Sequence, residues 1–492
     1  MAFVSVLLHS AVAGAATTTT IDPSLTFGVW EGWGTSLAWW ANVYGGSRAD
    51  ELADIFFTTK ETVTLATEPP VKLPGLGLTL ARYNAGGSSS APDAKGQHMV
   101  LSKNMRAGGE VFGFWLNGES AEPTSSSWDW SKDAGQVAML RKAKAAAGDS
   151  FIGELFSNTP MWWMLENRNP SGASDGSKDN LKATMHAQHA TYLATIAAHA
   201  QTSWNLSFAS VEAFNEPIAT WWKASGTQEG CHFDVATQAA VVPLLRAALD
   251  KRGLNATRVS ASDENTYDEA LSTWQGMGAA AQRDVAQINV HGYQQGGGRR
   301  DLLYTAAHDA KKILRNSEYG DGDDTGLTLA ANLNLDFKWL HPTAWVYWQV
   351  CDGGGWGLLN ADEDKKTISG VSAKFFVLAQ YARHVRPGDT IVDGGVDDDT
   401  VAALSPRNGG TLIVVSVNSG REEQTKRFDL SKLHGAVGAS VVRWVTAPKE
   451  SKGDRYVRYN DTVVESDGSF QVKFPAETIM TFEIAGVAGR YE

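Results

Sequence analysis

Eight short apolar segments recur along the first three quarters of this 492-residue chain, and each ends in polar or aromatic residues. They lie at Leu25–Trp33, Gly77–Tyr83, Phe151–Asn158, Ser207–Glu216, Arg258–Asp263, Gln287–Tyr293, Lys312–Glu318 and Thr343–Val350. Stretches rich in alanine and other helix formers lie between them, at Ala134–Ala147, Leu181–Thr202, Val235–Arg252, Tyr267–Ala281 and Gly370–His384. This alternation predicts an α/β fold, a (β/α)8 or TIM barrel. An open dinucleotide-binding sheet is disfavoured, because no GxGxxG motif follows the first strand.

The pattern changes after Pro387. Short alternating segments follow one another, separated by Gly, Asn and Asp turns, at Thr411–Val417, Ser440–Val445, Arg455–Tyr459, Ser469–Phe474 and Thr478–Ile484. We therefore predict a catalytic barrel over residues 17–386 and a β-sandwich over 387–492. The segment Thr17–Thr20 is a candidate strand of that sandwich. No low-complexity linker separates the two domains, so we expect them to pack directly against each other.

Charge and hydropathy exclude some partners. The net charge of −12 repels phosphate backbones and anionic lipid, so nucleic acid is not expected as a partner. Residues 1–16 contain a short apolar run and then small residues, which predicts a signal peptide, although the usual Lys or Arg at its start is missing. No later stretch approaches the roughly 20 apolar residues that span a bilayer. We expect a secreted, extracellular monomer without a membrane segment.

Sequons and cysteines agree with export. Three Asn-X-Ser/Thr sequons begin at Asn205, Asn255 and Asn460, as in a secreted glycoprotein. The two cysteines, Cys231 and Cys351, could form one disulfide, but they define neither a disulfide framework nor a zinc site.

Two glutamates at predicted strand ends are the leading catalytic candidates. The fourth segment ends in Asn215-Glu216-Pro217, and the seventh ends at Glu318. The active site of a (β/α)8 barrel lies at the carboxyl ends of its strands. Two carboxylates that face each other across a cleft can cleave an acetal. One protonates the leaving oxygen while the other attacks the anomeric carbon, and a separation of about 5–5.5 Å is typical of the retaining mechanism.

Other strand ends offer groups that could tune these carboxylates. Arg82 ends the second segment and could hold Glu318 ionised. Tyr293 ends the sixth and could hydrogen-bond the attacking carboxylate. Asn215 could hydrogen-bond a substrate hydroxyl.

Further acids compete for a role. Asp263 and Glu264 end the fifth segment, where a helix cap, a substrate-binding pair and direct catalysis all stay open. Glu31 ends the first segment and is expected to bind a sugar hydroxyl. His291 is interpreted as a polar cleft residue, since no partner at metal-ligand spacing accompanies it. Two acids inside strands are expected to be structural: Glu154 and Glu212.

The tryptophans are unusually numerous. The chain has 18 Trp, as many as Phe and more than its 12 Tyr. They gather after predicted strand ends, at Trp30, Trp33, Trp39, Trp40, Trp162, Trp163, Trp221, Trp222, Trp345, Trp348 and Trp356. Because the apolar faces of sugar rings stack on indole, this placement predicts a carbohydrate cleft. Candidate substrate-binding residues there are Trp33, Trp162 and Trp348, with Asn84 and Asn158 at two further strand ends. The C-terminal domain holds only Trp444, so we expect it to be structural.

Four segments resemble glycoside hydrolase family 30. They are Gly28–Gly46, Ala81–Gly87, Asn215-Glu216-Pro217 and Ser317-Glu318-Tyr319-Gly320, and the similarity extends over nearly the whole chain. Within the family the chain is most similar to the fungal endo-β-1,6-galactanases. The tryptophan-rich first segment is the more specific sign of this subgroup, because strand-end acids also fit the wider clan of retaining barrels.

The resemblance implies an acid/base role for Glu216 and a nucleophile role for Glu318. It further implies that Arg82, Asn215, Tyr293 and Trp348 position the nucleophile and the sugar. The substrate would be the β-1,6-galactan of arabinogalactan proteins, cut without metal or organic cofactor. Alternatives are an exo-β-1,6-galactobiohydrolase, a β-1,6-glucanase, a xylanase or a β-fucosidase of the same family and, from another class, a non-catalytic carbohydrate-binding protein.

Overall fold

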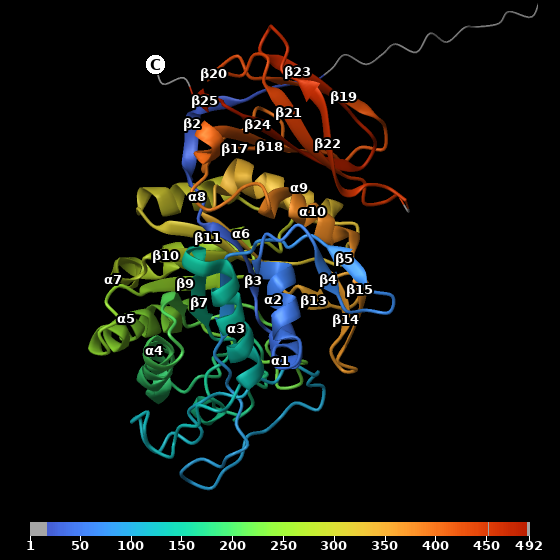
Figure 1. The fold of residues 1–492 in the computed structure, drawn as a ribbon. Helices are drawn as coiled ribbons and strands as arrows, with labels where there is room; N and C mark the ends of the chain where they lie inside the picture. The colour runs from blue at the N-terminus through green and yellow to red at the C-terminus, as the bar shows by residue number, and fades with distance from the viewer. Residues whose placement is uncertain (1–16, 451, 490–492) are drawn as a thin grey trace, which may run out of the picture.

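The computed structural model describes residues 17–450 and 452–489. Figure 1 shows a helical and parallel-stranded body with a β-rich domain at one end. The predicted signal peptide, residues 1–16, lies outside the described residues.

Eight parallel strands close into a barrel, which confirms the predicted (β/α)8 fold. In order around the barrel they are β3 (Gly32–Ser36), β6 (Leu80–Asn84), β7 (Ile152–Phe156), β8 (Phe208–Glu212), β9 (Arg258–Glu264), β10 (Gln287–His291), β11 (Ile313–Tyr319) and β12 (Ala344–Tyr347). Seven of them fall within the segments predicted from the sequence or within a residue of them. The exception is the first.

The first predicted strand is wrong in position. Residues 25–29 belong to β2 (Asp22–Val29), which pairs with β16 (Thr390–Asp393) of the C-terminal domain, and the barrel strand β3 begins only at Gly32. Between them the backbone of Trp30 donates to Asp389 and that of Glu31 donates to Thr343. One apolar run therefore serves two sheets, and its periodicity could not show where the chain passes from one to the other.

Helices surround the barrel. They are α1 (Trp40–Tyr44), α2 (Ala49–Phe57), α3 (Ala134–Ala147), α4 (His186–Ser203), α5 (Val235–Lys251), α6 (Tyr267–Gly276), α7 (Gly278–Asp284), α8 (Arg300–Asp309), α9 (Leu327–Leu335) and α10 (Ala373–Ala382). Local sequence explains some of their ends. Thr266 is the N-cap of α6: its hydroxyl accepts from the backbone N–H of Glu269 and donates to the Glu269 carboxylate.

The C-terminal domain contains two facing sheets. One has the order β1-β19-β23 and the other β2-β16-β17-β18-β24-β21-β22. The strands not yet introduced are β1 (Thr17–Thr20), β17 (Thr400–Ser405), β18 (Thr411–Asn418), β19 (Gln424–Asp429), β21 (Ser440–Thr446), β22 (Arg455–Val463), β23 (Ser469–Phe474) and β24 (Thr478–Ala485). Strand β1 pairs in parallel with β19, so the first described residues complete the sandwich.

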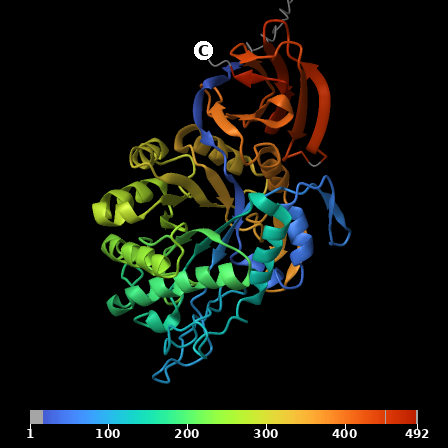
Figure 2. The same ribbon diagram turned by 60° about the vertical axis from the view of Figure 1, so that its left-hand side comes forward.

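Helix α10 joins the two domains. It packs against β21, β22 and β24, and the hydroxyl of Thr481 donates to the Gln380 side chain over 2.6 Å. The long connection over residues 85–133 lies at the opposite end of the barrel from the sandwich (Figures 1 and 2). Cys231 and Cys351 are both buried free thiols, so they form no disulfide. Among residues 17–450 and 452–489, no helix is long and apolar enough to cross a membrane.

Candidate active site

Glu216 and Glu318 lie side by side at the carboxyl ends of the barrel strands. Glu216 follows β8, and Glu318 is the penultimate residue of β11. One carboxylate oxygen of each glutamate and a ring nitrogen of His291 all lie within 4.8 Å of one another. Both glutamates are largely buried. The two acids that the sequence singled out therefore share one site.

Arg82 holds several of these groups together. Its Nη1 donates to Oε2 of Glu318 over 2.6 Å, and its Nη2 donates to Asn215 over 2.7 Å and to Asp263 over 2.9 Å. The guanidinium is buried and lies over the ring of Phe156, 3.5 Å from its centroid. A planar group with fixed N–H directions orients all three partners at once.

His291 lies between the two glutamates. Its Nδ1 is 3.1 Å from Oε1 of Glu216 and 3.4 Å from Oε1 of Glu318, and its Nε2 is 3.7 Å from Oδ1 of Asp263. Burial lowers the pKa of His291, but the three carboxylates outweigh it and raise that pKa to about 10. The imidazole is therefore protonated at neutral pH. A protonated ring has no lone pair for a metal, so this group of residues suits a proton.

The carboxylate of Glu318 accepts hydrogen bonds from two directions. The hydroxyl of Tyr293 donates to its Oε1 over 2.9 Å, opposite the bond from Arg82 to its Oε2. Burial raises the pKa of Glu318 above its ordinary value, while the charges of His291 and Arg82 oppose this rise. Two cations and a phenol at hydrogen-bonding distance favour the ionised carboxylate.

Glu216 has a partner that sequence reasoning missed. Asn265, two residues after Asp263, donates its Nδ2 to Oε1 of Glu216 over 2.7 Å. The backbone of Glu216 is in the left-handed region, with φ of 47°, and its N–H donates to the carbonyl of Asp263. Because Asn265 lies just beyond the fifth strand, its position in the sequence was compatible with a place in the active site, as for the neighbouring acids Asp263 and Glu264.

Asp263 and Glu264 have different surroundings, and neither is placed for direct catalysis. Asp263 is fully buried; it accepts from Arg82 and from the hydroxyl of Ser317. Although burial raises its pKa, Arg82 and His291 lower it to about 2. Asp263 is buried and its oxygens hold Arg82 and Ser317, so a contact with a sugar, which the sequence left open, stays a prediction. Glu264 instead accepts from Thr273 over 2.7 Å, on the helix side of β9.

Two further predicted site residues lie elsewhere. Glu31 directly precedes β3, so it is at the amino end of the barrel, where it accepts from Arg315 over 2.7 Å and from Thr343. Trp33 is buried between helices and barrel; its Nε1 donates to the carbonyl of Val385 over 2.7 Å, and its ring contacts Trp30. The predictions that Glu31 and Trp33 bind substrate are both wrong. The predicted strand ended at Trp33, which would place both residues at the carboxyl end of the barrel. The barrel strand instead begins at Gly32, so they lie toward its amino end.

Most of the tryptophans are core residues. Trp30, Trp33, Trp39, Trp40, Trp162 and Trp345 are among the largest fully buried side chains. Trp348 follows β12 and contacts Trp39 edge-on, with ring centroids 5.7 Å apart. Two tryptophans of the strand-end group are clearly exposed: Trp221, at 47%, and Trp356, at 37%. The prediction that the strand-end tryptophans line a cleft is therefore too broad, since adjacent indoles mostly pack inward.

The remaining predicted residues form the rim of the neighbouring strands β6 and β7. Oδ1 of Asn84 accepts from the backbone of Asn158 over 3.1 Å. The Nδ2 atoms of both asparagines and the Nε1 of Trp162 are buried and have no acceptor among the residues described. Their substrate contacts stay predictions. Inside the barrel, Glu154 accepts from Ser210, Gln287 and Arg315, and Glu212 is buried.

A closed (β/α)8 barrel with two adjacent carboxylates at the carboxyl ends of its strands is the arrangement expected of a retaining glycoside hydrolase. Comparison with known proteins agrees. The model of the family described as O-Glycosyl hydrolase family 30 matches residues 16–287. An endo-beta-1,6-galactanase of Hypocrea rufa is 50% identical over 482 residues, which cover 98% of this chain and 97% of that protein. The chain belongs to glycoside hydrolase family 30.

Solved structures support the fold. The catalytic domain of GH30 xylanase C from Talaromyces cellulolyticus superposes with a TM-score of 0.70 at 18% identity, covering 95% of this chain and 100% of that domain. A conserved exported protein from Bacteroides fragilis gives a TM-score of 0.76 at 15% identity, covering 95% of this chain and 100% of that protein. At these identities the likeness shows the shared architecture alone.

Proposed function

We propose that this protein is an endo-β-1,6-galactanase that hydrolyses the galactan side chains of arabinogalactan proteins with retention of configuration. The observation that supports the substrate is the 50% identity to the Hypocrea rufa endo-beta-1,6-galactanase over 98% of this chain. The observation that supports the mechanism is the pair of carboxylates held within one site by Arg82 and His291.

In this proposal Glu318 is the nucleophile. It is anchored by the Arg82 guanidinium and the Tyr293 hydroxyl, which favour a fixed, ionised carboxylate. A carboxylate oxygen of Glu318 attacks the anomeric carbon, and the bond from that carbon to the leaving oxygen breaks. The product of this step is a galactosyl ester on Glu318.

Glu216 is the acid/base. Its two side-chain contacts, from Asn265 and with His291, are both to Oε1. Among residues 17–450 and 452–489 no hydrogen bond to its Oε2 is found, which suits an oxygen that carries a proton to the leaving group. The same carboxylate then takes a proton from water, and that water opens the ester. Two inversions at the anomeric carbon give overall retention.

Location and assembly belong to the same proposal. We take the protein to act outside the cell as a monomer, on a polymer that an enzyme must meet in solution. The sequon residues Asn205, Asn255 and Asn460 are all exposed, which supports glycosylation during export.

The test is a comparison of substrates. The protein is incubated with de-arabinosylated arabinogalactan, β-1,6-glucan and xylan, and the products are identified by mass spectrometry and by proton NMR of the anomeric position. We expect mixed β-1,6-galacto-oligosaccharides from the first polymer, released initially as β-anomers. Release of galactobiose alone would identify an exo-galactobiohydrolase. Cleavage of another polymer in place of galactan would refute the proposed substrate. Binding without cleavage would refute the proposed catalytic activity.

A further inference from the structure

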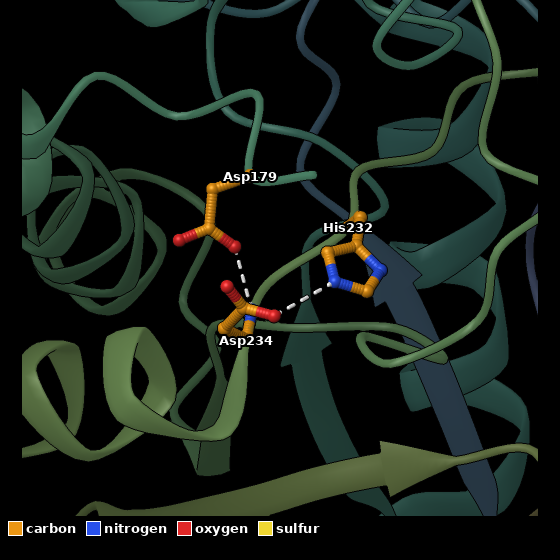
Figure 3. A group of neighbouring side chains, drawn as sticks. All are labelled: Asp179, His232 and Asp234. Carbon is orange, nitrogen blue, oxygen red and sulfur yellow. Dashed lines mark hydrogen bonds and ion pairs between the residues drawn. The ribbon is translucent and has the colours of Figure 1, made fainter. Parts of the chain in front are cut away.

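A second cluster of acidic and imidazole side chains lies apart from the two glutamates (Figure 3). Asp179 comes from the connection between β7 and α4. His232 and Asp234 come from the end of the connection between β8 and α5, and Asp234 directly precedes α5. One ligand atom of each residue lies within 4.8 Å of the other two. This separation is short enough for all three atoms to contact one ion.

The hydrogen bonds of His232 determine which ring nitrogen is free. Its Nδ1 is 3.0 Å from the carbonyl oxygen of Ala219. A carbonyl only accepts, so Nδ1 must carry the hydrogen and the lone pair of the neutral ring is on Nε2. Nε2 lies 3.3 Å from Oδ1 of Asp234, and His232 is 4% exposed. Two acceptors at this distance repel each other unless a cation, either a proton or a metal ion, lies between them.

Asp179 provides a second carboxylate at the same point. Its Oδ1 accepts from the backbone N–H of Asp234 over 2.6 Å, and its Oδ2 accepts from the hydroxyl of Thr237. These two bonds fix the orientation of the carboxylate while each oxygen keeps a further lone pair. The backbone carbonyl on His232 fixes the imidazole in the same way. Outer hydrogen bonds of this kind orient the ligands in metal sites.

We propose that Asp179, His232 and Asp234 bind one zinc ion. One imidazole nitrogen and two carboxylates, completed by water, are a ligand set that zinc accepts in tetrahedral geometry. Calcium takes six to eight oxygen ligands and magnesium keeps an octahedral shell rich in water, so neither suits a site with a nitrogen and few oxygens. Two carboxylates also balance the charge of the divalent ion.

The zinc would be structural and would act on the loop that carries Glu216. The backbone of Ala219, which accepts from His232, itself donates to the carbonyl of Glu216 over 3.1 Å. Phe233, between the two ligands of that loop, donates to the carbonyl of Pro217 over 2.8 Å. An ion at this position ties both ends of the β8–α5 connection to Asp179 and takes no part in the reaction.

The experiment is a titration of the chelator-treated full-length protein with zinc chloride, by calorimetry near neutral pH. We expect one saturable site with micromolar or tighter affinity, and no equivalent heat from magnesium or calcium chloride. The informative variant is His232→Asn. An asparagine amide can replace the Nδ1–H bond to Ala219 but has no atom at the position of Nε2. We expect it to weaken zinc binding at least about tenfold.

Asp234→Asn is the second variant, because Asn is also a good helix N-cap and removes only the charge. The matched control is His308→Asn, where an exposed histidine lies 3.5 Å from Asp309 and no third ligand is found in the part of the chain that the structure describes. Zinc affinity and the zinc-dependent rise in melting temperature should survive in the control and fall in both cluster variants. Absence of a saturable site in the wild type, or equal affinity in all four proteins, would overturn the proposal.

Discussion

The Nδ1 atom of His291 lies 3.1 Å from Oε1 of Glu216. The same nitrogen is 3.4 Å from Oε1 of Glu318, so one protonated ring contacts both carboxylates. A buried positive charge lets two buried acids lie close together, because it offsets the repulsion between them. The charge on His291 is therefore part of the stability of the site as well as of its chemistry.

The first prediction concerns pH. The pKa of His291 in the folded protein is raised to about 10, above the roughly 6.5 of an unfolded chain. Its contribution to stability is therefore complete below about pH 6.5 and is lost as the pH rises through about 10. Between these values the free energy of unfolding should fall by up to about 1.4 kcal/mol per pH unit because of this group.

The matched variant is His291→Asn, which keeps a donor near Glu216 but does not titrate. Urea unfolding from pH 6 to 10 should show a shallower alkaline loss of stability in this variant than in the wild type. Equal pH dependence of the two proteins would mean that His291 is not the charged group.

The second prediction separates the roles of the two glutamates. Glu318→Gly and Glu216→Gly should each lower turnover of an aryl β-galactobioside by orders of magnitude, because Glu318 forms the ester intermediate and Glu216 activates the water that opens it. Added azide should restore activity to both variants. The Glu318 variant should form the α-galactosyl azide, since azide replaces the nucleophile in a single inversion. The Glu216 variant should form the β-azide. The opposite pair of products would reverse the roles.

The third prediction tests Arg82, which donates to Glu318, Asn215 and Asp263. Arg82→Lys keeps the charge but loses the planar set of donors. We expect kcat to fall about 10²-fold, with a smaller change in KM, because the nucleophile is misplaced while substrate contacts remain. Arg315→Lys is the control, since Arg315 binds Glu31 at the amino end of the barrel and Glu154 inside it. It should lose stability and keep most of its kcat.

The fourth prediction tests the reassignment of Trp33 to the core. Trp33→Ala should lower the free energy of unfolding by about 3–5 kcal/mol, the usual cost of removing a buried aromatic side chain. KM for galactan, measured below the unfolding transition, should stay unchanged. Trp221→Ala is the comparison, because Trp221 is exposed and follows Glu216; its unfolding free energy should change by about 0.5 kcal/mol or less. A raised KM in Trp33→Ala with normal stability would restore its predicted role.

Local sequence was sufficient to predict much of this fold. Strand and helix periodicities predicted the barrel, because each strand is apolar enough to be read without its neighbours. They also placed Glu216 and Glu318 at strand ends, and the carboxyl ends of parallel strands share one face of a barrel. The change of pattern after Pro387 indicated the sandwich for the same reason.

Other features depended on contacts between distant segments. Whether Glu31 and Trp33 face the cleft depended on where β2 ends and β3 begins, which is decided by pairing with β16 and β12. The burial of most tryptophans likewise depended on packing against segments that are distant in the sequence.

The sequence by itself determined the fold class, the two glutamates and the family, because these are carried by short motifs and regular periods. Only the tertiary structure decided the charge on His291 and the hydrogen bonds of Asn265. It also brought Asp179 to His232 and Asp234, 53 positions further along the chain or more. Charge state and ligand geometry depend on distances of a few ångströms between segments that are far apart in the sequence, and no local pattern records those distances.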